Sequence, residues 1–253
     1  MSASAKQPRG VFGMTIIALV MVGVLAGLGV WQLQRRDEKH ALIAALTERL
    51  ALAPVPLPKD WSSLSAARDE FRRVTFTATF ESKPDVMVYT SGSAVREDVS
   101  GPGTWAFLPA RLTDGRTLVV NAGYVPNTMQ DRAREDRAVA PLITGAPVVL
   151  TGYLRFPEER SLFSAHEDRA KRLWFVRDHR AMSAANGWGT AAPFYIDLES
   201  PVPPSGVPKP GPLQVHLRDN HMQYAITWFG LALVVLITFG FWLVGQRRAR
   251  LQP

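Results

Sequence analysis

The sequence predicts a membrane protein in which two transmembrane helices flank an exported α+β domain, built on a mostly antiparallel β-sheet of barrel- or sandwich-like form. Two observations predict the helices: residues 11–33 and 222–245 are long apolar runs without a charged side chain. A membrane-spanning helix needs about 20 apolar residues, and both runs exceed this length. The third observation is the alternation of apolar and polar residues between the runs, which is typical of half-buried strands.

The first apolar run is expected to be a retained helix rather than a cleaved signal peptide. It is longer than the roughly 7–15 residues of a signal-peptide core, and it ends in WQLQRR (residues 31–36) without a site for cleavage after small residues. Lys6 and Arg9 precede this helix, and three arginines lie between residues 247 and 250. Because basic residues favour the cytoplasmic side, both termini are predicted to be cytoplasmic.

The predicted organisation has five parts, in a protein of the bacterial inner membrane. They are a cytoplasmic N-terminus (1–10), the first transmembrane helix (11–33), a periplasmic domain (34–221) that ends in a Pro-rich linker (201–212), the second transmembrane helix (222–245) and a cytoplasmic C-terminus (246–253). The net charge of +7 comes mainly from the basic ends, so nucleic acid is not an expected partner, whereas the lipid bilayer is. The chain contains no cysteine, which excludes disulfides and thiolate metal sites.

Local patterns predict the elements of the exported domain in chain order. The first helix continues through residues 37–50 until the PVPLP segment stops it. A Gly/Ser-rich loop is expected at 91–103, and Asp114-Gly115 marks the turn of a hairpin. Gly187 should end a short helix, and the prolines of 201–212 indicate a stiff spacer. The expected strands are 73–80, 86–89, 105–112, 117–125, 148–154, 174–176 and 194–198, with helices at 131–138 (or a charged loop) and 180–186.

Most sequence motifs of known catalytic and nucleotide-binding sites are absent from this sequence. There is no HExxH, GxSxG, P-loop or GxGxxG motif, so we expect no enzyme activity. His166 near Asp168 and His179 beside Asp178 have some resemblance to metal ligands. Because no tetrahedral set of ligands converges in the sequence, these histidines are interpreted as surface polar residues.

His221 differs from the other histidines in its position. Asp219 and Asn220 are good N-cap residues, so His221 falls in the first turn of the second transmembrane helix, at the outer surface of the bilayer. Tyr224 and Trp228 share its helix face. An imidazole above two aromatic rings could bind haem, whose iron commonly takes an axial His. The alternative, which position alone favours, is an interfacial histidine in an aromatic belt without a ligand.

Several segments together resemble the Surfeit locus protein 1 family. The most specific is DNHMQYAITWF (219–229), which is similar to the family's NNHxxYAxTWF signature. The other segments, in the family's order, are WQLQRRDEK (31–39), LVVNAGYVP (118–126), TGYLRFPE (151–158) with Phe163 downstream, WFVRD (174–178) and PFYID (193–197). The sequence departs from the family pattern at Ala122 (usually Arg), Tyr124 (usually Trp) and Asp219 (usually Asn), so a role that depends on an arginine in that strand is in doubt.

The resemblance implies a non-enzymatic assembly factor for haem-copper cytochrome c oxidase. Its implied partners are the catalytic subunit of the oxidase and haem a synthase. Haem a would be held transiently, with His221 as axial ligand of the iron and with Tyr224, Trp228 and Trp31 lining the site. The complete lack of cysteine fits a role with haem better than copper delivery.

Two other functions remain open at this stage. The protein could be a haem-free scaffold for an early oxidase subunit, because small residues at Gly23, Gly27, Ala26 and Gly29 would allow close contact between helices. A sensory or ligand-binding exported module is the other alternative. The short predicted cytoplasmic segments (1–10 and 246–253) argue against it, since they leave no room for an output domain.

Overall fold

A computed structural model describes residues 9–93, 95–129, 131–161, 164–214 and 219–251. The chain divides into two compact units, which we describe separately. One contains residues 1–44 and 218–253 and is called the helix unit, and the other contains residues 45–217 and is called the sheet unit. The predicted N-terminal segment, except its last two residues, and Phe163 lie outside the described residues.

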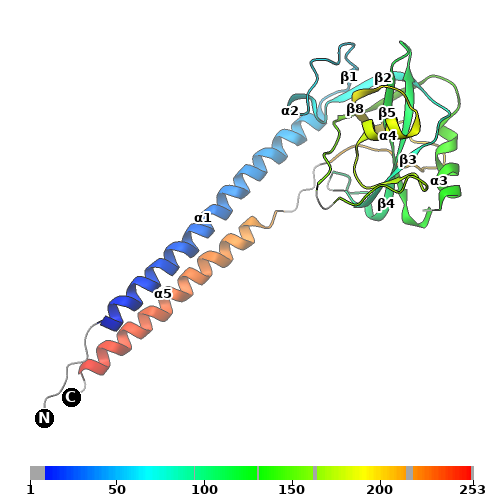
Figure 1. The fold of residues 1–253 in the computed structure, drawn as a ribbon. Coiled ribbons are helices and arrows are strands. Elements are labelled where there is room, and N and C mark those ends of the chain that lie inside the picture. The colour runs from blue at the N-terminus through cyan, green and yellow to red at the C-terminus, as the bar shows by residue number, and fades with distance from the viewer. Residues whose placement is uncertain (1–8, 94, 130, 162–163, 215–218, 252–253) are drawn as a thin grey trace. The chain divides into compact units, whose positions relative to one another are not determined.

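The helix unit consists of two long helices, α1 (Arg9–Ala51) and α5 (His221–Leu251), of which α1 extends into the sheet unit (Figure 1). Both are long and apolar enough to cross a membrane, with mean hydropathies of 2.5 and 2.2 in their most apolar windows. The side chains in these windows are mostly exposed, unlike those of a core helix in a soluble protein. At 1.5 Å per residue the 43 residues of α1 reach about 64 Å. The helix includes residues 37–50, so the predicted continuation is confirmed.

The two helices pack through one stripe on each, in which partly or fully buried residues recur at alternating steps of three and four. The stripe of α1 contains Ala18, Val22, Leu25, Gly29, Gln32 and Arg36, and that of α5 contains His221, Ala225, Trp228, Ala232, Val235, Phe239 and Trp242. A seven-residue period is typical of helices that pack along their length. The small residues Ala18, Gly29, Ala225 and Ala232 are the most buried members of the two stripes.

The glycines of α1 divide between two faces of the helix. A Cβ atom added to Gly29 would lie 2.7 Å from the ring of Phe229, so a larger side chain at this position would displace that ring of α5. Gly23 and Gly27 are exposed, lie on the opposite face of α1, and have no atom within 4 Å of an added Cβ. Of the small residues singled out in the sequence, only Gly29 and the partly buried Ala26 lie toward α5.

We expect Gly29→Val to separate the two helices, because the added methyl groups collide with the ring of Phe229 and overpacking costs about 1–3 kcal/mol. Gly27→Val is the matched control on the open face. Since the chain has no cysteine, spin labels can be attached at Gln34→Cys and Gln223→Cys alone. The distance distribution between the labels should lengthen and broaden in Gly29→Val but not in Gly27→Val; equal distributions would contradict this packing.

The sheet unit contains a mixed sheet of eight strands in the order β1-β2-β6-β8-β5-β4-β3-β7, with a further pairing of β2 and β4. Five of the eight pairings are antiparallel and three are parallel. The strands are β1 (Val55–Pro56), β2 (Arg73–Phe80), β3 (Val86–Gly92), β4 (Ser100–Leu112), β5 (Thr117–Pro126), β6 (Val148–Arg155), β7 (Leu173–Trp174) and β8 (Ala191–Ser200). Because β2 pairs with both β6 and β4, the pairings of β2, β6, β8, β5 and β4 close into a ring.

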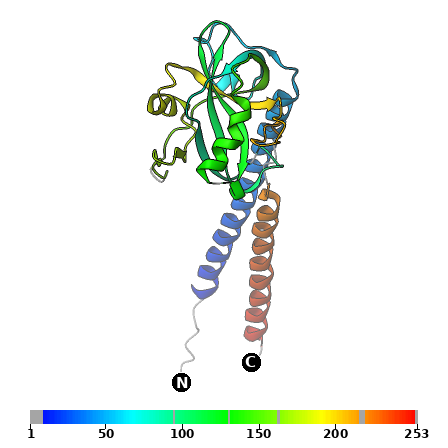
Figure 2. The same cartoon turned by 90° about the vertical axis from the view of Figure 1, so that its right-hand side faces the viewer.

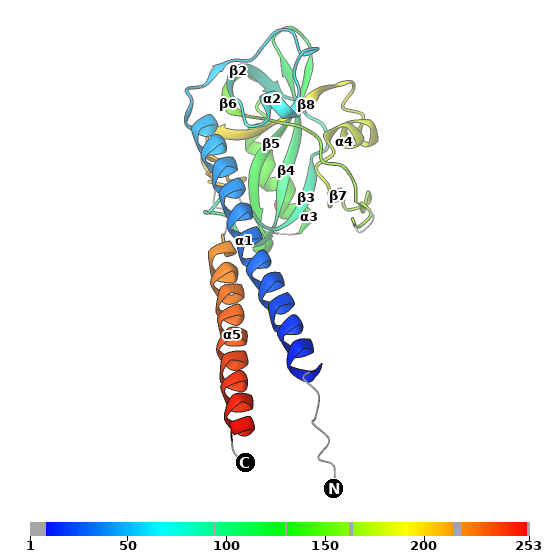
Figure 3. The same ribbon diagram turned by 90° about the vertical axis from the view of Figure 1, so that its left-hand side faces the viewer.

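Three short helices, α2 (Ala66–Asp69), α3 (Arg132–Val139) and α4 (His179–Asn186), accompany the sheet. The helix α3 lies in front of the strands in Figure 2, and α4 lies beside β8 in Figure 3. Asp178 caps the start of α4 through the backbone N–H groups of Arg180 and Ala181. Gly187 ends it with a φ of 63°, which a glycine adopts without strain, as the sequence predicts.

Two apolar cores lie on opposite faces of the central strands. In β4, Ala106, Leu108 and Ala110 belong to the first core, while Trp105 and Phe107 belong to the second. The first core has members from all five strands of the ring, and it includes Ala122 of β5, which is completely buried. The second core is closed by residues at and just after α4, Met182 and Trp188. This burial on both faces explains why β4 and β5 are nearly continuous apolar runs.

The sheet is mostly antiparallel, as the sequence predicts, but β5 and β8 pair in parallel, with β8 inserted between β5 and β6. The segment 201–212, which the sequence predicts to be a stiff Pro-rich linker, packs on the sheet: the backbones of Lys209 and Tyr124 exchange two hydrogen bonds of 2.8 and 3.1 Å. The buried guanidinium of Arg96 also donates to the carbonyl oxygens of Lys209, Pro210 and Gly211.

Candidate functional site

The start of α5 is fixed by a cap that involves Asp219. The first intrahelical bond runs from the backbone N–H of Tyr224 to the carbonyl oxygen of Asn220. The Oδ1 atom of Asp219 accepts a hydrogen bond of 2.9 Å from the backbone N–H of His221. His221 is therefore the first residue of the helix, in the first turn as the sequence predicts, and its backbone is held in place by the residue two positions earlier.

Asp219 also connects this cap to α1. Its Oδ2 atom lies 2.7 Å from Nε2 of His40 and 3.9 Å from Nε of Arg36. The hydrogen bond from the backbone of His221, followed by the contact with His40, lowers the pKa of the Asp219 carboxyl below its usual range. Because a carboxylate has two acceptor oxygens, Asp219 contacts the backbone of His221 and the ring of His40 with a different oxygen each.

The imidazole of His221 makes a second contact with α1. Its Nδ1 atom lies 2.8 Å from Oε1 of Gln32, and both side chains are partly buried. Nε2 of His221 has no hydrogen-bond partner among the residues that the structure describes. An amide oxygen can only accept, so the contact with Oε1 of Gln32 favours the neutral tautomer of His221 that carries its proton on Nδ1 and its lone pair on Nε2.

Among the described residues, no ring contact joins the aromatic residues predicted to line the site to His221. Trp31 is 48% exposed and Tyr224 is 54% exposed, and both lie outside the packing stripes. Trp228 belongs to the stripe of α5 and is partly buried. Within the described part of the chain no ring contact joins these three residues, and the guanidinium of Arg35 lies 5.8 Å from the ring centre of Trp31. Gln32, rather than Trp31, is the residue of α1 that contacts His221.

Gln32, His40 and the link through Asp219 were missed by the sequence interpretation. Gln32 and Trp31 belong to the same motif (31–39), of which Trp31 alone is predicted to line the site. A signal was present, because Gln32 continues the seven-residue spacing of Ala18, Leu25 and Gly29.

The donor set at His221 fits a haem iron. A single imidazole nitrogen with an available lone pair is the ligand that haem proteins use as a proximal ligand. The exposed rings of Tyr224 and Trp31 leave apolar surface beside it. Among the described residues no group of three or more His, Asp or Glu side chains is arranged to hold a metal ion.

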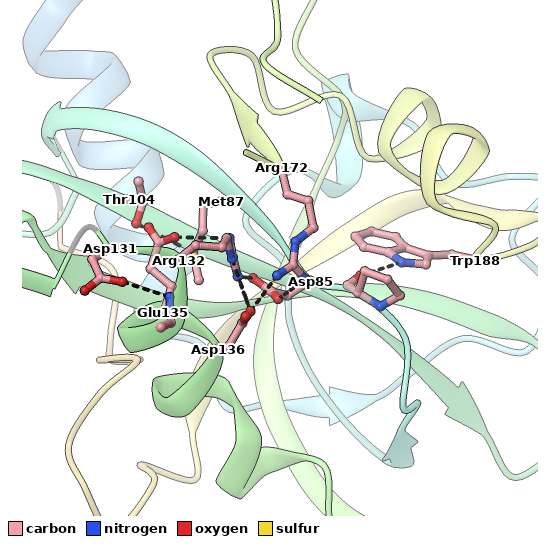
Figure 4. A network of polar contacts seen from close by, with 11 residues as sticks. Asp85, Met87, Thr104, Asp131, Arg132, Glu135, Asp136, Arg172 and Trp188 are labelled. Carbon is pink, nitrogen blue, oxygen red and sulfur yellow. Dashed lines mark hydrogen bonds and ion pairs between the residues drawn. The ribbon is translucent and has the colours of Figure 1, made fainter. Parts of the chain in front are cut away.

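The sheet unit contains a separate ionic network, shown in Figure 4. The buried Asp85 accepts hydrogen bonds from Arg132 and from Arg172, and Asp136 binds the same two guanidinium groups at 2.8 and 2.6 Å. Burial raises the pKa of the neighbouring Glu135. The network joins α3 to Asp85, just before β3, and to Arg172, just before β7. We therefore interpret it as ion pairs that hold these segments together.

His179 is not a surface residue, contrary to the sequence interpretation. It is completely buried, and its Nε2 atom lies 2.8 Å from the carbonyl oxygen of Ala192. Burial lowers the pKa of its imidazole, which favours the neutral form. This contact connects α4 to β8 and leaves His179 as a core residue rather than a metal ligand.

The comparison with protein families decides the relationship of this chain to known proteins. A family model described as the SURF1 family matches residues 19–233, which include Trp31, Gln32, His221, Tyr224 and Trp228. The chain belongs to the SURF1 family. The resemblance given by the sequence motifs is thereby confirmed.

Curated SURF1 relatives match over most of their length. "Surfeit locus protein 1" of Takifugu rubripes is 32% identical over 224 residues, which cover 84% of this chain and 90% of the relative. "Surfeit locus protein 1" of Homo sapiens is 35% identical over 228 residues, covering 85% of this chain and 72% of the relative. A "SURF1-like protein" of Monosiga brevicollis is 31% identical over 256 residues, covering 98% and 92%.

Proposed function

We propose that this SURF1 protein is an assembly factor for haem-copper cytochrome c oxidase and that it assists the delivery of haem a to the catalytic subunit, without catalysing a reaction itself. Membership of the SURF1 family supports the assembly role. The observation that carries the haem proposal is the contact of His221 Nδ1 with Gln32, because it makes Nε2 available to a haem iron.

The proposed location is a bacterial inner membrane, with both termini in the cytoplasm. Residues 11–33 and 222–245 would span the bilayer and residues 34–221 would lie in the periplasm. The exposure of the apolar side chains of α1 and α5 supports this arrangement. The closed ring of strand pairings favours a barrel-like rather than a sandwich-like form for the exported domain.

Haem a is the cargo in this proposal. Its apolar tail would partition into the bilayer, so a carrier should bind it where the two helices leave the membrane. His221 would supply one axial bond to the iron, and Tyr224, Trp228 and Trp31 would line the porphyrin. One axial histidine holds haem less firmly than two would, so the protein could release haem a to the catalytic subunit. Haem a synthase is the other proposed partner.

A haem-free scaffold is the second candidate, and the exposed face of α1 favours it. Gly23 and Gly27 lie opposite α5, and an added Cβ at either position would meet nothing within 4 Å. Another transmembrane helix could approach this face closely. The two candidates differ in whether haem a accompanies the protein.

Deletion of the gene tests the assembly role. We expect membranes of the deletion strain to lose most of their cytochrome c oxidase activity and most of the haem a in that enzyme, with recovery when the intact gene is restored. Restoring the gene with His221→Ala separates the candidates, because a scaffold would still support assembly. Normal activity and normal haem a content in the deletion strain would overturn both.

A further inference from the structure

The hydrogen bond between Gln32 and His221 determines which nitrogen of the imidazole can bind a metal. A neutral imidazole carries one proton, on Nδ1 or on Nε2. In water the proton prefers Nε2, the nitrogen that has no partner among the residues described here. The Oε1 atom of Gln32, 2.8 Å from Nδ1, stabilises the opposite tautomer because an amide oxygen accepts and does not donate.

We propose that Gln32 is the positioning residue of the haem site: it holds the proton of His221 on Nδ1, so that Nε2 presents its lone pair to the iron. This inference rests on the proposed function and adds a residue that acts through His221 rather than by touching the haem. Partners on the second nitrogen of a metal-binding histidine commonly set its tautomer and the orientation of its ring.

The surroundings of His221 fix the ring from two directions. Gln32, Arg36 and His40 follow one another at steps of four residues, so they share one face of α1. Gln32 binds the ring of His221, while His40 binds Asp219, which holds the backbone N–H of His221. With both ends of the residue attached to the same face of α1, rotation about its side-chain bonds is restricted.

The position of Gln32 in the helix stripe supports a specific role. The α1 positions toward α5 before it, from Ala18 to Gly29, are apolar or small, and Gln32 is the first polar side chain in this series. A partly buried amide needs a partner, and His221 is the hydrogen-bond partner of Gln32 among the described residues. Nearby Gln34 is exposed, so it offers a control on the same helix.

The test uses three variants of the full-length protein in detergent micelles. Gln32→Leu removes the acceptor with little change in volume. Gln32→Glu keeps an oxygen acceptor and should rescue the tautomer. Gln34→Leu makes the same chemical change as Gln32→Leu at an exposed position.

The first measurement is ¹⁵N NMR of labelled histidine in the haem-free protein, at a pH where His221 is neutral, with its signals assigned by comparison with His221→Ala. The wild type, Gln32→Glu and Gln34→Leu should show a protonated Nδ1 and an unprotonated Nε2. Gln32→Leu should show the proton mainly on Nε2. A wild-type His221 with its proton on Nε2, or a Gln32→Leu variant with an unchanged tautomer, would overturn the inference.

The second measurement is a haem titration followed by the visible spectrum. We expect Gln32→Leu to bind haem about 10- to 100-fold more weakly than the wild type, which is the range for loss of such a partner. Gln32→Glu and Gln34→Leu should bind close to wild type. If the wild type binds haem and Gln32→Leu binds equally well, only the role of Gln32 is wrong. If the wild type binds no haem at all, the proposed function itself fails.

Discussion

His221→Ala is expected to abolish detectable haem binding by the purified protein. In our proposal the substitution removes the axial ligand of the iron, the imidazole of His221, and leaves only Tyr224, Trp228 and Trp31 to line the porphyrin. The affinity should fall by more than about 100-fold, beyond the range expected for the loss of a residue that only hydrogen-bonds the metal-binding histidine. A haem titration in detergent micelles, followed at the Soret band, measures the change.

His40→Ala is the matched control for this experiment. His40 also lies at the outer end of the helix pair, but it contacts Asp219 rather than offering a nitrogen to the haem in our proposal. Its variant should keep the Soret band of the wild type with at most a modest loss of affinity. Binding that disappears in His40→Ala but survives in His221→Ala would reverse the ligand assignment.

Asp197→Ala is expected to lower the free energy of unfolding by about 3–5 kcal/mol, which is a large share of the 5–15 kcal/mol typical of a domain. Asp197 is buried in β8 and accepts hydrogen bonds from Arg155 at 2.7 Å and from Asn121 at 2.6 Å. Arg155 is itself only 11% exposed and also binds Glu70. Without Asp197, the guanidinium of Arg155 keeps only one of its two carboxylate partners, Glu70.

Urea unfolding of the full-length protein in micelles, followed by tryptophan fluorescence, tests this expectation. Asp114→Ala is the control, because the pair of Asp114 and Arg116 in the β4–β5 turn is exposed to water and screened. The double variant Asp197→Ala with Arg155→Met should recover only part of the loss, since it removes the half-paired guanidinium but leaves Glu70 without its ion-pair partner. Equal shifts of the unfolding midpoint in Asp197→Ala and Asp114→Ala would contradict the structural importance of this network.

Local patterns predict the elements that depend on local interactions. The alternation of Val74, Phe76, Ala78 and Phe80 with threonines gives β2 with its observed bounds, and Asp114-Gly115 gives the turn between β4 and β5. Gly187 predicts the end of α4, because a helix commonly ends at a residue in the left-handed conformation and glycine is the residue that adopts it most readily. These signals lie within a few residues of the structure they determine.

Pairings between distant segments leave no such signal. The two residues of β1 lie in the proline-rich segment that stops α1, and they pair in parallel with β2. Arg96 binds the carbonyl oxygens of Lys209 to Gly211 across more than 100 residues of sequence, so no local pattern indicates that the linker is attached to the sheet. For Gln32 the helix spacing is a local signal, but it does not identify the partner His221, which is 189 residues away.

The most direct test of haem carriage is the spectrum of the wild-type protein purified from cells that also make haem a. We predict that haem a copurifies with the protein, that its Soret band is present in the pure fraction, and that the His221→Ala protein from the same cells lacks it. If the wild-type protein is purified without haem a while haem a accumulates in the membranes of those cells, the proposal that His221 carries haem a is wrong.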